Sequence, residues 1–210
     1  MSNNKMRVIK IKEGRNWLSA GVPIDDNYPE PFGELTDLEF STVHGRTGIM
    51  KLLIEAGADV NAKSSTGLET APLGSAVCGG HADAVQLLID YGADLEIKDL
   101  LGKTCLFHAI EFGYWEILQV LLNSGAKVNV SDQWGITPLM YAVMYNNSEF
   151  VKILLASGAD VNAADENGKT VFDFVSHKRY SIPILGNFFT SERDQEMLKL
   201  LEEAKLKADR

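Results

Sequence analysis

One tetrapeptide recurs along this chain at nearly constant spacing, and it constrains the fold more than any other feature. The copies read GADV, GADL, GAKV and GADV, and they begin at Gly57, Gly92, Gly125 and Gly158. The intervals between them are 35, 33 and 33 residues. Self-similarity at such a period is typical of a protein built from stacked repeats, each contacting only its neighbours. The sequence therefore predicts a function on a long shared surface rather than in one catalytic pocket.

The residues around each copy predict two helices per repeat. Leucine doublets at helical spacing precede each glycine: Leu52-Leu53, Leu87-Leu88, Leu121-Leu122 and Leu154-Leu155. They indicate an amphipathic helix, with Leu122 as an example of a core leucine. Downstream, Gly-x-Thr turns open the next helix at Thr104, Thr137 and Thr170. We expect the threonines to cap these helices, with Pro72 and Pro138 at the first helical position of their own repeats.

Several parts of a known repeat pattern occur here together and in phase. They are the helix opening Thr137-Pro138-Leu139, the helix exit that begins at Gly158 and the inter-helix turn Gly80-His81. These motifs resemble the ankyrin repeat, and the resemblance runs without a break over residues 34–177, with four full repeats. It implies an all-α ankyrin-repeat solenoid of stacked helix–turn–helix units with β-hairpin-type loops. It also implies that the ring of His81 bonds to the backbone.

The two ends of the chain depart from the pattern. Residues 1–30 are an N-terminal segment or a partial capping repeat, because residues 17–25 echo the helix-exit pattern. Residues 31–177 are the predicted ankyrin repeats. Residues 178–210 contain an apolar insertion, 178–191, followed by a predicted C-terminal capping helix that starts at Ser191. We expect the insertion to cover the core of the cap, although it could instead reach a partner.

Charge is distributed unevenly along the chain. The net charge is −9, yet the first 15 residues are basic and acidic residues dominate the central repeats. An acidic surface opposes nucleic-acid phosphates and favours a basic protein partner, although the acids could simply keep the chain soluble. No run of 18 apolar residues is present, so no membrane span is expected, and the polar N-terminus favours a cytoplasmic location. The two cysteines, Cys78 and Cys105, are expected to be packed thiols.

No arrangement of residues in the sequence indicates catalysis. The four histidines are His44, His81, His108 and His177, and no catalytic or phosphate-loop motif accompanies them. An enzyme site around Asp173 and His177 is the disfavoured alternative, because no nucleophile with a base beside it is visible. We therefore expect no enzyme activity, no cofactor and no metal, and a monomer when the chain is free.

The resemblance places the binding residues at the hairpin tips and on the exposed face of each first helix, where the family binds partner proteins. The third repeat carries Leu100, Leu101, Lys103, Glu111 and Phe112 at these positions. The fourth repeat carries Gln133, Trp134, Ile136, Met144 and Tyr145, and the fifth carries Glu166 and Lys169. Large apolar residues gather in two neighbouring repeats, which indicates an interface unless they pack against each other. Glu111 and Asp132 are expected as acids on its rim.

The function predicted from the sequence is therefore that of a non-enzymatic protein-binding module. It is expected to bind its partner on the concave surface, and that partner is expected to be basic rather than acidic. Two narrower alternatives remain open. One is an immunity or inhibitor protein that neutralises a toxin or an enzyme. The other is an accessory or chaperone subunit for an enzyme. The fold supports both by analogy alone.

Overall fold

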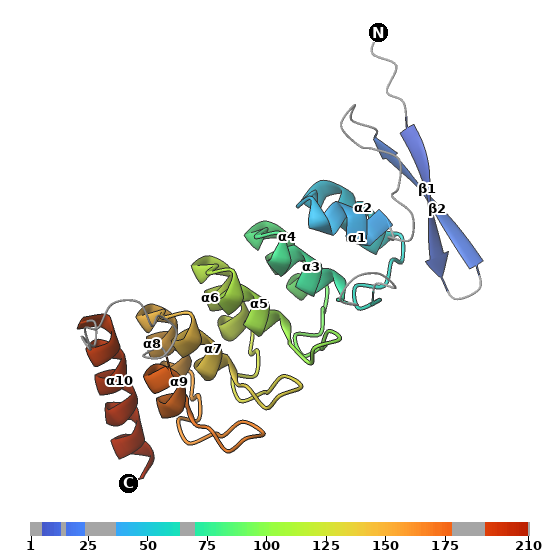
Figure 1. Cartoon of the computed structure of the whole chain (residues 1–210). Coiled ribbons are helices and arrows are strands. Elements are labelled where there is room, and N and C mark those ends of the chain that lie inside the picture. Colours follow the sequence, from blue (N-terminus) through green and yellow to red (C-terminus); the bar gives the residue numbers. More distant parts are fainter. Residues whose placement is uncertain (1–5, 14–15, 24–36, 64–69, 178–191, 210) are drawn as a thin grey trace, which may run out of the picture. The chain divides into compact units, whose positions relative to one another are not determined.

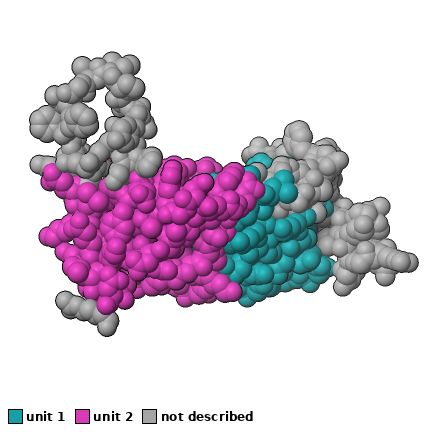
Figure 2. All heavy atoms as spheres, turned by 60° about the horizontal axis from the view of Figure 1, so that its bottom comes forward, with its two compact units in different colours: residues 1–108 teal, residues 109–210 magenta. Residues whose placement is uncertain are grey.

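The computed structural model describes residues 6–13, 16–23, 37–63, 70–177 and 192–209 (Figure 1). The predicted all-α repeat architecture is confirmed: helix–turn–helix pairs follow one another along the chain, joined by loops that reverse its direction. The chain divides into two compact units, Met1–His108 and Ala109–Arg210, which are coloured separately in Figure 2.

The first unit begins with a β-hairpin. Strand β1 (Met6–Glu13) pairs with β2 (Asn16–Pro23) in antiparallel register, from Met6 opposite Pro23 to Glu13 opposite Asn16. The structure therefore corrects the suggestion that residues 17–25 end a helix, since most of them form a strand. The β-branched Val8, Ile9 and Ile11 favour a strand, and a connection of only two residues favours a hairpin.

Two helix pairs follow in the first unit. They are α1 (Asp37–Val43) with α2 (Thr47–Glu55), and α3 (Pro72–Cys78) with α4 (Ala82–Asp90). Helix α1 packs against α2 and α3, while α4 packs against α3 and α2 (Figure 1). The predicted backbone contact of His81 is confirmed, because its Nε2 lies 2.9 Å from the carbonyl oxygen of Val43 in the preceding repeat. Helix α5 (Cys105–Glu111) begins in this unit.

The second unit contains the end of α5, α6 (Trp115–Asn123), α7 (Pro138–Met144), α8 (Ser148–Ala156), α9 (Val171–His177) and α10 (Glu192–Ala208). Helix α7 packs against α8 and α9, and α10 lies against the same two helices (Figure 1). The helix predicted near the C-terminus is thus present, with Met197 and Leu201 buried. The apolar insertion 178–191 lies outside the described residues.

The predicted proline positions and the Thr137 cap are confirmed, whereas the Thr170 hydroxyl does not accept a hydrogen bond as predicted. Pro72 and Pro138 stand at the beginning of α3 and α7. The Thr137 hydroxyl accepts a hydrogen bond from the Met140 backbone N–H at 3.3 Å. In α9 the cap is reversed, because the Asp173 carboxylate accepts bonds from both the backbone N–H and the hydroxyl of Thr170, at 2.8 and 3.0 Å.

Only one leucine of each doublet belongs to the core. Four leucines have no exposed surface, and each lies four residues before its glycine: Leu53, Leu88, Leu121 and Leu154. Their neighbours in the doublets are half-buried or exposed, so the expectation that Leu122 is a core residue was wrong. Adjacent residues of a helix point about 100° apart, and only one of two can face the neighbouring helices.

Asparagine side chains join successive repeats. The Asn129 amide donates to the Gly158 carbonyl oxygen at 2.9 Å and accepts from the Asp160 N–H at 2.8 Å. Asn61 makes the same pair of bonds one repeat apart in the first unit, with Gly92 and Asp94. The sequence indicated turn residues at these positions, and the structure adds that they couple neighbouring repeats.

Candidate functional site

An aspartate closes each of the last three hairpin tips. Asp99, Asp132 and Asp165 are buried, and one carboxylate oxygen of each accepts the backbone N–H groups two and four residues ahead at 2.8–3.0 Å. The two residues directly after each aspartate therefore stand at the tip. They are Leu100-Leu101, Gln133-Trp134 and Glu166-Asn167. Trp134 therefore lies in a loop whose backbone is held by hydrogen bonds to Asp132.

Neighbouring tips in the second unit touch through their backbones. The Glu166 N–H donates to the Trp134 carbonyl oxygen at 3.2 Å. Gly135, which follows Trp134, has a φ of +78°, and a Cβ added there would lie 2.8 Å from the Glu166 nitrogen. Gly168 has a similar φ of +74°, yet a Cβ there would meet nothing within 4 Å. A comparison of substitutions at Gly135 and Gly168 therefore separates the effect of backbone strain from the effect of close approach.

We expect Gly135→Ala to lower the free energy of unfolding more than Gly168→Ala does. A positive φ disfavours alanine by about 1–2 kcal/mol at either position, and at Gly135 the methyl group must also push the next tip away. Urea unfolding of the two variants beside the parent measures the difference. Equal losses would contradict the close packing of the tips around Trp134 and Glu166.

Five large apolar side chains between α5 and the end of α7 are exposed in the described part of the second unit, and one of them, Trp115, is 41% exposed and stacks on Phe150. The other four, Phe112, Trp134, Met144 and Tyr145, have between 44% and 50% of their surface accessible to solvent. With Glu111, which is half-buried, we call them the α5–α7 surface. Of the other predicted residues in this unit, Gln133 and Glu166 are exposed, and Ile136 and Lys169 are half-buried.

A line of contacts connects the two ends of this surface. The Tyr145 hydroxyl donates to Glu111 Oε1 at 3.3 Å, and the Tyr145 ring lies 6.2 Å from the Tyr141 ring. The Tyr141 hydroxyl in turn donates to Asp132 Oδ2 at 3.3 Å. Asp132 then holds the Trp134 N–H through its other oxygen. Tyr141 is the residue that the sequence reasoning missed. The sequence feature that could have identified Tyr141 is its position four residues before Tyr145, which places both residues on the same face of α7.

The turn after α7 holds Tyr145 in place. Asn146 adopts a φ of +56°, where the other repeats have a glycine. Asparagine tolerates this left-handed conformation better than most residues do. The Asn147 side chain then caps α8 by accepting from the Phe150 N–H at 3.1 Å. The replacement of Gly-His by Asn146-Asn147 therefore preserves the turn.

Two predicted residues are not where the sequence reasoning placed them. Lys103 was expected at an exposed tip, yet only 7% of its surface is accessible. Asp132 was expected on the rim, yet it is 6% exposed and serves the tip and Tyr141. The closed hairpin explains the burial of both residues, because Asp132 is the first residue of its tip and Lys103 is the fifth residue of its own. Leu100 is exposed and Leu101 is half-buried. Both belong, with Lys103, to the first unit, whereas the other predicted binding residues belong to the second unit.

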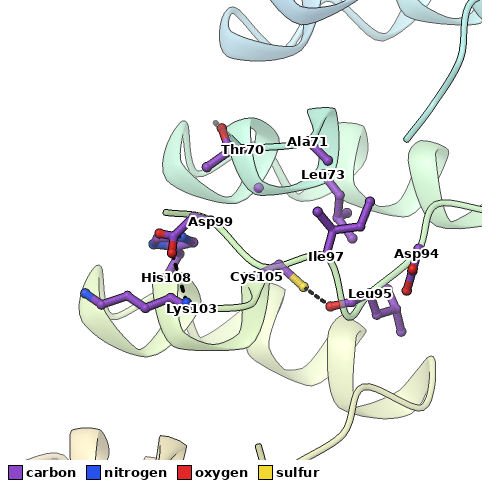
Figure 3. A pocket seen from close by; sticks show the side chains of 11 residues that line it. Thr70, Ala71, Leu73, Asp94, Leu95, Ile97, Asp99, Lys103, Cys105 and His108 are labelled. Carbon is purple, nitrogen blue, oxygen red and sulfur yellow. Dashed lines mark hydrogen bonds and ion pairs between the residues drawn. The ribbon is translucent and has the colours of Figure 1, made fainter. Parts of the chain in front are cut away.

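The first unit contains a small, largely apolar cavity of about 10 Å³, and Thr70, Asp99, Cys105 and His108 are the polar residues of interest among those that line it (Figure 3). His108 Nε2 points at Asp99 Oδ2, 3.3 Å away, and the Cys105 thiol donates to the Leu95 carbonyl oxygen at 3.3 Å. Burial raises the pKa of Cys105 to about 12, so the thiolate that a nucleophile needs does not form near neutral pH. The volume holds at most one water, and this cluster is best explained as part of the core.

The described residues offer little else that resembles a reaction centre. Among them, no group of three or more His, Cys, Asp or Glu side chains is arranged to hold a metal ion. An open polar hollow of about 290 Å³ lies beside Tyr145 and is lined also by Asn146, Asn147, Ser148 and Glu196. Within the described part of the chain, none of the helices combines the length and hydrophobicity needed to cross a lipid bilayer.

Known proteins share these repeats. Family models of ankyrin repeats match residues 38–132 and 123–175. Protein phosphatase 1 regulatory subunit 12A of Rattus norvegicus is 35% identical over 96 residues, which are 46% of this chain and 9% of that protein. Ankyrin repeat and SOCS box protein 6 of Homo sapiens is 35% identical over 85 residues, 40% of this chain and 20% of that protein.

BRCA1-associated RING domain protein 1 of Caenorhabditis elegans is 32% identical over 101 residues, 48% of this chain and 14% of that protein. The chain thus matches a fifth or less of the length of each of these relatives, and the likeness concerns the repeats. Taken together, the two family models span residues 38–175, which contain the helix pairs from α1 to α8 and the aspartate-closed tips described above. On this agreement of motif, helix pairing and family match, the chain belongs to the ankyrin-repeat family.

Proposed function

We propose that this chain is a non-enzymatic module that binds a partner protein on the concave surface of its repeats, centred on the α5–α7 surface. The observation that carries the proposal is the exposure of Phe112, Trp134, Met144 and Tyr145 on fixed elements. Ankyrin repeats bind protein partners, and the relatives include a regulatory subunit. Gln133, Ile136, Glu166 and Lys169 would flank the anchors, and Leu100, Leu101 and the largely buried Lys103 complete the proposed set.

The energetics of this surface favour binding. Large exposed aromatic side chains supply most of the affinity in many interfaces, and Trp and Tyr are the residues most enriched there. Residues that are already held in place lose little conformational entropy on association. Trp134 meets that condition through Asp132, and Tyr145 meets it through Glu111 and Tyr141.

The charges near the surface support a basic partner. Between residues 105 and 152 the sequence has four acidic residues, Glu111, Glu116, Asp132 and Glu149, and two lysines, Lys127 and Lys152, of which Lys152 pairs with Glu149 at 2.8 Å. Asp132 is buried, and the other three are half-buried or exposed. A negative potential of this kind steers positively charged partners and repels nucleic acid.

Two narrower roles fit the same surface. An immunity or inhibitor protein would block the activity of its partner, whereas an accessory or chaperone subunit would leave that activity intact or raise it. We place either role in the cytoplasm, since the sequence has only two cysteines and thus no disulfide framework of the kind found in secreted domains. The chain is proposed to be monomeric until it meets its partner.

Affinity capture tests the proposal. We expect the parent chain to retain a basic protein from a native extract, and the double variant Trp134→Ala/Tyr145→Ala to lose it. Leu206→Ala is the control, because Leu206 is a 64% exposed apolar residue on α10 and is not part of the α5–α7 surface. Equal retention by the double variant, or retention of nucleic acid alone, would overturn the proposed site. The activity of the captured protein, with and without the chain, then separates inhibitor from accessory subunit.

A further inference from the structure

The fourth residue of the first helix faces the tip aspartate in two repeats. In the fourth repeat this residue is Tyr141 on α7, whose hydroxyl donates to Asp132 Oδ2 at 3.3 Å. In the third repeat it is His108 on α5, whose Nε2 lies 3.3 Å from Asp99 Oδ2 (Figure 3). In both aspartates the other oxygen, Oδ1, accepts the backbone N–H groups that close the tip. One position on the helix therefore meets the second carboxylate oxygen in each of these repeats.

The fifth repeat carries phenylalanine at this position. Its tip aspartate, Asp165, also accepts the N–H groups two and four residues ahead through Oδ1, both at 2.8 Å. Phe174 is the fourth residue of α9 and stands nine residues after Asp165, as Tyr141 does after Asp132. A phenyl ring has no hydrogen to donate to a carboxylate. The chain thus contains one tip with a tyrosine bond to its aspartate and one tip in which this position cannot supply it.

The bond from Tyr141 restrains the carboxylate that closes the fourth tip. The terminal torsion of an aspartate is broad, so little in the side chain itself prevents the carboxylate from turning. Asp132 is 6% exposed and Tyr141 is 8% exposed, so water has little access to replace the hydroxyl. A buried carboxylate oxygen that loses its donor is unfavourable where it stands. Without the hydroxyl, Asp132 would turn toward solvent and release the N–H groups of Trp134 and Ile136.

We infer that Tyr141 is a positioning residue for partner binding, which acts through Asp132 on the tip that presents Trp134. The inference rests on the proposed function and adds to it a buried residue that sets how firmly one anchor is held. A loop that is ordered beforehand loses less conformational entropy on association, and such preorganisation mainly slows dissociation. By the same argument the fifth tip, which has Phe174 below it in sequence, is the more adaptable of the two.

Hydrogen exchange of the ¹⁵N-labelled full chain, followed by NMR, tests the restraint without a partner. Tyr141→Phe keeps the ring and removes the hydroxyl, and we expect the amides of Trp134 and Ile136 to exchange about five-fold faster. The amides of Asn167 and Lys169, which bind the next tip aspartate, are the internal control and should keep their rates. Unchanged exchange at Trp134 and Ile136, or equal acceleration of all four amides, would overturn the inference.

The reciprocal variant is Phe174→Tyr, which adds a hydroxyl at the same position of α9. We expect it to slow the exchange of the Asn167 and Lys169 amides and to leave the Trp134 amide unchanged. If the fifth tip exchanges as fast as it does in the parent, this helix position does not govern the tip and the inference fails.

A double-mutant cycle with the captured partner tests the step from restraint to binding. Tyr141→Phe should weaken binding about three- to five-fold in the parent chain and have no further effect in the Trp134→Ala background. A residue that merely stabilised the fold would cause the same loss in both backgrounds. Additive losses would therefore overturn the positioning role of Tyr141.

The two proposals fail in different ways. If the exchange of the Trp134 amide does not respond to Tyr141→Phe while Trp134→Ala still loses the partner, the positioning role is wrong and the protein-binding function stands. If Trp134→Ala binds the partner as well as the parent does, the proposed binding surface is wrong, and Tyr141 then positions nothing that the partner uses.

Discussion

Leu121→Ala is expected to lower the free energy of unfolding by about 2–5 kcal/mol, and Leu122→Ala by only about 1 kcal/mol. Leu121 is fully buried in α6, so its truncation removes apolar contacts and leaves a cavity that the surrounding helices fill incompletely. Leu122 is half-buried, and solvent replaces much of what its side chain loses. The two residues are adjacent in one helix, so helix propensity changes equally in both variants.

Urea unfolding followed by circular dichroism measures both losses. Because the stability of a repeat protein is roughly a sum over repeats and their interfaces, the loss at Leu121 should appear in the transition that includes α6. Similar losses in the two variants would contradict the assignment of one core leucine to each doublet. The same pair of substitutions at Leu154 and Leu155 repeats the comparison in α8.

Trp134→Ala and Tyr145→Ala are each expected to weaken partner binding by about 2 kcal/mol or more, which is about 30-fold in Kd. The loss should come from faster dissociation, because truncation removes buried contact area that forms only in the complex. Surface plasmon resonance with the captured partner gives both rate constants. Tyr145→Phe keeps the ring and loses the bond to Glu111, so it separates apolar contact from hydrogen bonding.

Glu166→Gln is the complementary control for these kinetics. Glu166 is exposed at the next tip, and the loss of a rim charge should mainly slow association, with an effect that shrinks as salt is added. Parent-like binding by both aromatic variants would show that the α5–α7 surface is the wrong site. The apolar insertion 178–191 would then be the next segment to truncate.

The repeat architecture could be predicted from the sequence because it depends on local patterns that recur. Gly135, Thr137 and Pro138 act within a few residues of themselves, and each repeat supplies the same set again. The exposure of Trp134, Met144 and Tyr145 followed from the same registration, which places the first at a hairpin tip and the other two at the end of a first helix. Whether these residues bind a partner remains a prediction.

What the sequence could not show depends on contacts between elements. Asp132 and Glu111 are both acids near the same surface, and only the three-dimensional arrangement makes the first a buried loop residue and the second a partner of Tyr145. The pairing of Tyr141 with Asp132 spans nine residues and carries no local signal. The N-terminal hairpin was hidden because residues 17–25 imitate a repeat motif that β-pairing overrides.

The aspartate closure of the tips has a consequence for how this chain can change. The Asp132 carboxylate closes the loop by accepting the backbone N–H groups of Trp134 and Ile136, so the closure does not depend on which side chains stand at positions 133 and 134. Dipeptides can therefore be exchanged between tips, as Leu100-Leu101 and Glu166-Asn167 already differ from Gln133-Trp134. We expect substitutions at these positions to change the surface proposed for partner binding while the folding equilibrium stays nearly constant. A lineage of such chains can thus diversify in recognition far faster than in architecture.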